Sequence, residues 1–206
     1  MRRIFILTAV TVVLIFAGAR FLSAELPTDE FLRVSFSGTE ITFNPLHTFT
    51  STEAQLYTAL YEGLVTYHPL TMEPVPAAAS RWEISADKTT YWFFLRETGR
   101  YWNGDPVTAA DFKDTWLTLL DPEEKSEYSF LFDIIEGAAD YRTGKNTDPL
   151  SVGIRAVDTF ILEVRLEHPA GHFLKVLCHH SFAPVHPRFL DREDWSISSI
   201  IPGNGP

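Results

Sequence analysis

Cysteine and basic residues are both scarce in this sequence. Cys178 is the only cysteine among 206 residues, so the chain has no internal disulfide and no metal site built from several thiolates. Lysine and arginine number 17 against 27 aspartates and glutamates, a formal net charge of −10. The basic residues form no cluster, and binding to nucleic acid or anionic lipid depends on concentrated positive charge. We therefore expect no nucleic acid partner.

Motifs of the common enzyme classes are also missing. The chain has no GxSxG, P-loop, GxGxxG or HExxH pattern, and no pair of carboxylates stands out at a glycosidase spacing. His168 and His172 have the spacing of two ligands on one helical face, but Pro169 and Gly171 between them disfavour a helix. We predict no metal site, no cofactor and no catalytic residues.

One catalytic alternative stays open, a secreted hydrolase that uses Cys178 and His179. A catalytic histidine has to approach the thiol in space, and side chains adjacent in sequence rarely face each other. His179 and His180 are also adjacent, and on a strand they would point to opposite faces. Because Cys178 follows an apolar run, a small buried side chain is the better interpretation.

Residues 1–24 have the composition of a secretory signal peptide. Arg2 and Arg3 precede an apolar run of about sixteen residues, shorter than the roughly twenty that a membrane-spanning helix needs. An uncleaved anchor is the alternative. Cleavage after Ala24 would remove three arginines and leave a net charge of about −13. We predict Sec-type export to the periplasm or another extracytoplasmic location, without lipid on a cysteine, because none lies near the cleavage site.

The remaining residues predict a mixed α and β fold. Apolar residues recur at helical spacing after Ser51, which we expect to cap that helix, with Gly63 at its C-terminal end. Thr108, with Asp111 three residues later, predicts a capped helix that stops at Asp121. Apolar runs bounded by turn residues predict strands at 31–36, 40–43, 82–84, 91–96, 152–157, 160–166 and 181–185, and helical segments at 126–143 and 173–178.

Aromatic residues concentrate in the middle of the chain. The segment Thr90–Leu95 has almost no polar alternation, which predicts a strand covered on both faces. We expect Trp92 and Trp116 to be buried between this hairpin and the helix after Thr108. The cluster as a whole is interpreted as core, with a ligand surface lined by one or two of its rings as the alternative. Its members are Trp82, Trp92, Phe94, Tyr101 and Trp102.

An ordered series of segments resembles the extracytoplasmic solute-binding proteins of family 5, which serve oligopeptide, dipeptide and nickel ABC transporters. Each segment alone is a weak signal, but their order and spacing together are specific, and the resemblance extends from about Leu32 to Pro206. The segments that carry it best are Leu60–Val65 (LYEGLV), Ala79–Ser85 (ASRWEIS), Thr90–Arg96 (TYWFFLR) and Trp102–Phe112 (WNGDPVTAADF).

The resemblance implies the N-terminal part of a two-lobed periplasmic-binding-protein fold, of α/β class. Residues 1–24 would be the signal peptide and 25–51 would open lobe I. Residues 52–185 would form an α+β subdomain inserted into that lobe, and 186–206 would return to it. Family members are much longer, so we expect a truncated lobe I without lobe II. A remnant without function, or half of a split gene, are the corresponding alternatives.

The resemblance also implies what the protein binds. Such a protein holds a peptide or another small solute outside the cytoplasm and delivers it to an ABC permease in the inner membrane, with the full-length protein a monomer. An extended peptide is bound as an added strand between the lobes. The resemblance points to ligand contacts at Glu40, Ile41 and Thr42 from lobe I, and at Tyr128 and His179 from the inserted subdomain; a solvated turn, a helix anchor and a strand end are the structural alternatives for Glu40, Tyr128 and His179.

The export hypothesis makes a direct prediction. Protein recovered from outside the cytoplasm should begin near Glu25, because cleavage after Ala24 leaves that residue first. N-terminal sequencing of the secreted material measures this. Recovery of a chain that still begins at Met1, in the membrane fraction, would instead show an uncleaved anchor.

Overall fold

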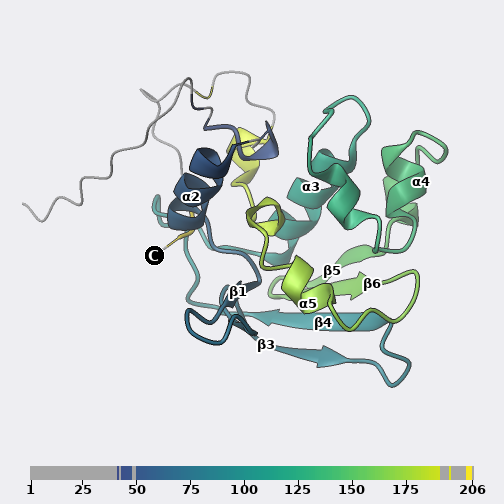
Figure 1. Ribbon diagram of the computed structural model, residues 1–206, viewed down its shortest axis with the longest axis horizontal. Helices are drawn as coiled ribbons and strands as arrows, with labels where there is room; N and C mark the ends of the chain where they lie inside the picture. The colour runs from purple at the N-terminus through teal and green to yellow at the C-terminus, as the bar shows by residue number, and fades with distance from the viewer. Residues whose placement is uncertain (1–40, 42, 48–49, 191–194, 196–202, 206) are drawn as a thin grey trace, which may run out of the picture. The chain divides into compact units, whose positions relative to one another are not determined.

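The chain contains a four-stranded antiparallel sheet with helices over one face (Figure 1). The computed structural model describes residues 41, 43–47, 50–190, 195 and 203–205, all within the compact unit Gly38–Pro206. The α-helices are α2 (Ser51–Leu60), α3 (Ala109–Leu120), α4 (Ala138–Arg142) and α5 (Phe173–Val176). The strands are β1 (Val65–Tyr67), β2 (Pro74–Pro76), β3 (Ala79–Ile84), β4 (Thr90–Leu95), β5 (Ile154–Asp158) and β6 (Ile161–Arg165). Short 3-10 helices are η1 (Pro45–His47), η2 (Ser129–Phe132), η3 (Pro149–Ser151), η4 (His180–Phe182) and η5 (Pro187–Phe189).

The mixed fold expected from the sequence is confirmed. The large sheet has the order β3-β4-β6-β5, and β1 pairs with β2 in a separate two-stranded ribbon. The two predicted hairpins are present, as β3–β4 and as β5–β6, and α3 packs against β5 and β6. The expected strand at 31–36 lies outside the described residues, and Ile41 and Phe43 are in neither helix nor strand. Among the residues that the structure describes, no helix is both long enough and apolar enough to cross a bilayer.

Strand β4 differs from its prediction because only one face of the sheet is covered. Its alternate residues Tyr91, Phe93 and Leu95 are buried against the helices, whereas Trp92 and Phe94 are half-buried on the other face. Trp92 donates its indole N–H to the Glu163 carboxylate, with Nε1 and Oε2 2.9 Å apart. The prediction that Trp92 would be buried under α3 is therefore wrong, since β-strand side chains alternate between faces.

Helix α3 forms as its sequence predicts. Thr108 Oγ1 accepts from the Asp111 N–H, and the Asp111 carboxylate accepts from the Thr108 N–H at 2.8 Å, which completes a reciprocal capping box. Trp116 is 0% exposed, and its indole N–H donates to the Phe182 carbonyl oxygen at 3.0 Å. Three aromatic rings meet the indole edge-on, at 5.4 to 6.2 Å between centroids: Phe112, Phe132 and Phe182.

Helix α2 begins one residue earlier than expected. Its N-cap is Thr50 and not Ser51, because Glu53 then occupies the third helical position and accepts from the Thr50 N–H at 2.8 Å. With Ser51 as cap, Ala54 would occupy the third helical position, and its methyl group cannot accept a hydrogen bond from the N-cap N–H. The helix ends at Leu60 with Tyr61 as C-cap, so the expectation for Gly63 is also wrong.

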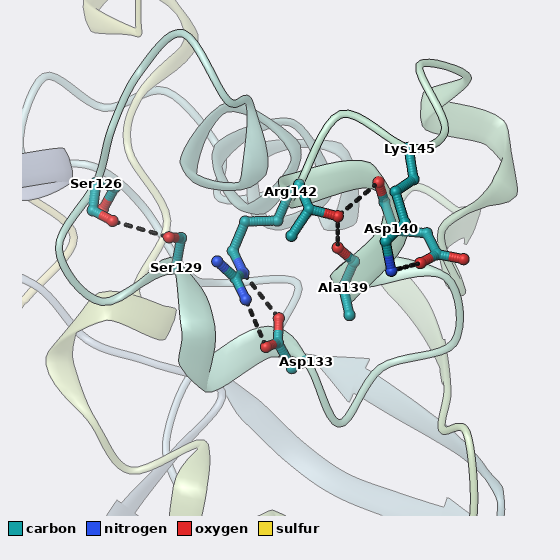
Figure 2. A network of polar contacts seen from close by, with 8 residues as sticks. Ser126, Ser129, Asp133, Ala139, Asp140, Arg142 and Lys145 are labelled. Atoms are coloured by element: carbon teal, nitrogen blue, oxygen red, sulfur yellow. Dashed lines mark hydrogen bonds and ion pairs between the residues drawn. The ribbon is translucent and has the colours of Figure 1, made fainter.

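The segment predicted to be helical over 126–143 is divided. Helix η2 and helix α4 are separated at Gly137, whose positive φ of 70° favours glycine, and where an added Cβ would lie 2.4 Å from the Ser151 carbonyl oxygen. Arg142 joins the two pieces by donating to both oxygens of Asp133, at 2.8 and 2.7 Å (Figure 2). The described residues between η2 and α4 form no continuous series of helical hydrogen bonds, and the Arg142–Asp133 ion pair connects α4 to the residue after η2.

The segment 181–185 is not the strand that its apolar composition suggested. Residues His180–Phe182 form η4, and His179 caps it by accepting from the Ser181 N–H through Nδ1 at 3.3 Å. Phe182 inserts between Phe132 and Trp116, with its ring centroid 4.2 Å from that of Phe132. Tertiary packing of this one ring therefore overrides the local preference for an extended chain.

The described residues near the end of the sequence pack against the end of α2. Asn204 Oδ1 accepts from the Glu62 N–H at 2.9 Å, and its Nδ2 donates to the Glu62 carbonyl at 2.8 Å. A Cβ added at Gly203 would lie 2.0 Å from the Leu60 carbonyl oxygen, so only glycine allows this approach. The two segments are thus fixed to each other by backbone geometry.

Replacing Trp116 by alanine should lower the free energy of unfolding by about 3–5 kcal/mol, because it leaves a cavity in the hydrophobic core. Trp102→Ala is the matched control, since Trp102 is 58% exposed and its loss should cost less than about 0.5 kcal/mol. Urea unfolding followed by circular dichroism measures both variants. Equal losses of stability in the two would show that Trp116 is not the packing centre.

Candidate functional site

Two of the five predicted ligand contacts lie together. Tyr128 directly precedes η2, and His179 directly precedes η4, yet their ring centroids are 4.8 Å apart. Ile41 is half-buried in a segment without regular structure, while Glu40 and Thr42 lie outside the described residues. The structure therefore joins the two residues that come from the predicted subdomain.

The loop that carries Tyr128 is fixed on both sides. Ser126 Oγ donates to the Leu46 carbonyl at 2.6 Å, and Ser129 Oγ donates to the Ser126 carbonyl at 2.8 Å, the second contact being visible in Figure 2. Buried Ser126 thus connects the loop to the segment before α2. These bonds fix the backbone of the loop on either side of Tyr128.

His180 belongs to the same aromatic group, although the sequence did not single it out. Its ring centroid lies 4.1 Å from that of His179, 5.7 Å from Tyr128 and 6.2 Å from Tyr57. The two histidines do not point to opposite faces as they would on a strand, because they cap and begin a 3-10 helix. The sequence feature that could have pointed to His180 was its position in a pair of adjacent histidines after an apolar run.

Two adjoining cavities open beside these rings. The Tyr61 cavity, of about 200 Å³, is lined by Tyr61, Thr66, Cys178, His180 and Ala183 among others. The Lys175 cavity, of about 410 Å³, is lined by Tyr67, Leu131, Lys175, Val176 and His179 among others. Thr58, Cys178, His179 and His180 line both, so the histidine pair forms the wall that the cavities share.

This shared wall is uncharged at neutral pH. Burial lowers the pKa of His179, and burial together with the neighbouring His179 lowers the pKa of His180 to about 4. Among the described residues, buried His180 Nε2 has no hydrogen-bond partner, so a proton placed there would be unpaired. Burial also raises the pKa of the Cys178 thiol to about 11, and its S–H donates to the Leu174 carbonyl, with Sγ and O 3.4 Å apart.

The ribbon β1–β2 and α5 are linked at the edge of the Lys175 cavity. The Tyr67 hydroxyl donates to the Lys175 carbonyl at 3.0 Å, and Lys175 Nζ pairs with Glu73 at 2.9 Å. Lys175 is the cation of this cavity wall, and its charge is neutralised by Glu73. The cavity therefore presents mainly apolar and aromatic groups to a ligand.

Metal ligation finds no support in the part of the chain that the structure describes. No group of three or more His, Cys, Asp or Glu side chains there could hold an ion. His172 directly precedes α5 and His168 is exposed in the preceding loop, so the pair does not share a helical face. A third cavity, of about 420 Å³, is lined by Arg96 and Glu62, which form an ion pair.

The fold is that of a solute-binding protein. Residues 73–206 match the family described as "Bacterial extracellular solute-binding proteins, family 5 Middle". The chain belongs to this family, as its sequence resemblance predicted, and an extracytoplasmic location follows from that membership.

Curated relatives are longer than this chain. It is 36% identical over 180 residues to the dipeptide-binding protein DppE of Bacillus subtilis, covering 86% of this chain and 33% of the relative. It is 34% identical over 158 residues to the periplasmic oligopeptide-binding protein OppA of Escherichia coli, covering 74% of this chain and 28% of the relative. The chain thus spans about a third of the length of such relatives.

Solved structures give the same result for the fold. OppA of Burkholderia pseudomallei superimposes with a TM-score of 0.73 at 33% identity, over 79% of this chain and 32% of that one. Haemophilus influenzae OppA in complex with RPPGFSPFR gives a TM-score of 0.74 at 31% identity, over 80% and 32%. These neighbours are two-lobed periplasmic binding proteins of mixed α and β structure, so the predicted fold class is confirmed.

The lowered pKa of His180 predicts an acid-sensitive stability. Between its ordinary pKa of 6.5 and about 4 in the folded protein, the unfolded chain binds the extra proton. The free energy of unfolding should therefore fall as pH falls through this window, and less steeply in His180→Gln. Urea unfolding at half-unit pH steps measures the slope. His168→Gln, at an exposed position, is the control and should keep the wild-type slope.

Proposed function

We propose that the protein is the substrate-binding component of an ABC transporter and that it binds peptides for delivery to a permease in the membrane. Membership of the family 5 solute-binding proteins is the observation that carries this proposal. Relatives named for dipeptide and oligopeptide binding support peptides as the ligand class. The monomeric state, and processing of residues 1–24 as a non-lipidated Sec signal, are parts of the same proposal.

The ligand contacts belong to the proposal as well. The Tyr128 ring packs beside His179, which lines both cavities, and a neutral imidazole beside a phenol can exchange hydrogen bonds with a peptide main chain. Glu40, Ile41 and Thr42 would border the ligand from the segment before α2. Main-chain bonds of this kind tolerate many ligand side chains, because the backbone is common to all peptides.

The domain boundaries are likewise proposed. Residues 52–185 would form the inserted α+β subdomain, with 25–51 and 186–206 in lobe I. The sheet and the helices that cover it share one hydrophobic core, which supports treating most of 52–185 as a unit.

A hydrolase based on Cys178 and His179 is not proposed. A thiol with a pKa of about 11 is protonated at neutral pH, whereas nucleophilic cysteines have a lowered pKa. His179 Nδ1 already accepts from the Ser181 N–H, so this nitrogen is engaged in capping η4. We infer a binding protein without catalytic activity.

Binding of tripeptides by the chain tests the proposal. Addition of an equimolar tripeptide mixture should shift the NMR resonances of Tyr128 and His179, and Tyr128→Ala and His179→Ala should each weaken binding by about tenfold. Tyr141→Phe, in α4 and away from both cavities, should bind like wild type.

The affinity should be low, because the chain spans about a third of its relatives' length and carries only part of the contacts. We expect the chain to lose roughly 4 kcal/mol of binding free energy relative to E. coli OppA, which corresponds to a Kd about a thousandfold weaker. Titration calorimetry of both proteins in parallel measures this difference. Micromolar binding by the monomer would show that this portion is sufficient alone. A folded chain with no peptide-induced shifts would favour a remnant without function.

A further inference from the structure

The Lys175 cavity has a composition that selects among peptide side chains. Its volume is about 410 Å³, and a cavity of roughly 150 Å³ already admits a benzene ring. Apolar Leu131 and Val176 line it together with the rings of Tyr67 and His179. The space is therefore large enough for a bulky side chain and offers it ring faces and aliphatic groups.

Most of the ionisable groups that line this cavity are uncharged or paired, and His172 lines it as well. The His179 and His180 imidazoles have lowered pKa values and are neutral at pH 7, and the Cys178 thiol is protonated. Lys175 is engaged by Glu73 at 2.9 Å, so an acidic ligand would have to compete with an existing ion pair. A basic ligand would meet no free carboxylate among the lining residues and would be desolvated without compensation.

Aromatic rings are placed to contact a further ring. Tyr67 on β1 and the His179–His180 pair before and within η4 line the cavity from different elements, and the Tyr128 ring packs against both histidines. Rings supported in this way lose little conformational freedom on binding, and aromatic pairs are stabilised beyond the area that they bury.

We propose that the Lys175 cavity binds one uncharged aromatic side chain of the ligand, so that the protein prefers peptides containing phenylalanine, tyrosine or tryptophan. This inference rests on the proposed peptide-binding function and adds the substrate class to it. The rest of the peptide is held through its main chain, and this cavity adds selectivity for one residue.

A guest series in trialanine tests the preference. Phe, Leu, Lys or Asp is placed at each of the three positions in turn, and binding to the full chain is measured by NMR titration. The best Phe peptide should bind about tenfold tighter than trialanine, as expected for partial burial of a ring, and Leu should gain less. Lys and Asp guests should gain nothing. Equal binding of all guests, or tightest binding of a charged one, would overturn the inference while leaving peptide binding itself in place.

A pair of matched variants locates the effect. Thr58 and Thr143 are both exposed and both donate to a carbonyl four residues earlier at 2.8 Å, but only Thr58 lines the cavity. Thr58→Trp should obstruct the cavity and reduce the Phe gain, measured against trialanine on the same variant, to less than about twofold. Thr143→Trp should keep the full gain, because Thr143 does not line the cavity. Thermal unfolding confirms that each variant is folded, and a Phe gain that survives Thr58→Trp would contradict this location.

A single-residue probe separates this inference from the proposed function. N-acetylphenylalanine amide carries the side chain without a peptide, and it should shift Val176 and His179 more strongly than N-acetyllysine amide at equal concentration. If no tripeptide binds but this preference is seen, the peptide-binding proposal fails and the aromatic site stands. If neither tripeptides nor the amide bind, both fail.

Discussion

Burial of Trp116 is the interaction on which the arrangement of the site depends. The indole packs against Phe112, Phe132 and Phe182, and its N–H bond to the Phe182 carbonyl connects α3 to the segment that carries His179 and His180. Phe132, three residues after Ser129 in η2, packs on the same indole and brings Tyr128 with it. Trp116 therefore contacts both segments of the site, which also pack directly on each other through Phe132 and Phe182.

The sequence was informative where a structural preference is local. Thr108 and Asp111 predicted the start of α3, and the alternation in 160–166 predicted β6, because capping and strand periodicity depend on residues close together in the chain. It was less informative for β4, where a continuous apolar run suggested burial on both faces. Trp92 and Phe94 cover their own face of the sheet instead, with Glu163 and Arg81 above them.

Sequence reasoning identified only some of the residues of the site. The family resemblance pointed to Tyr128 and His179, but 3-10 turns have no long periodicity, so nothing in 126–143 or 178–185 predicted their geometry. The role of His180 follows from Phe182 being drawn into the core, a tertiary event that turns two adjacent rings to within 4.1 Å. Neutral histidines of this kind are recognised from burial and not from residue type.

The two hydrogen bonds between the Asn204 side chain and the Glu62 backbone have a consequence for the order of folding. These residues are 142 positions apart, and contacts of such separation form slowly because a long loop has to close first. During synthesis or export from the N-terminus, α2 and Tyr61 exist well before Gly203 can reach the Leu60 carbonyl. The third cavity, which Asn204 and Gly205 line together with Glu62 and Arg96, is therefore completed last.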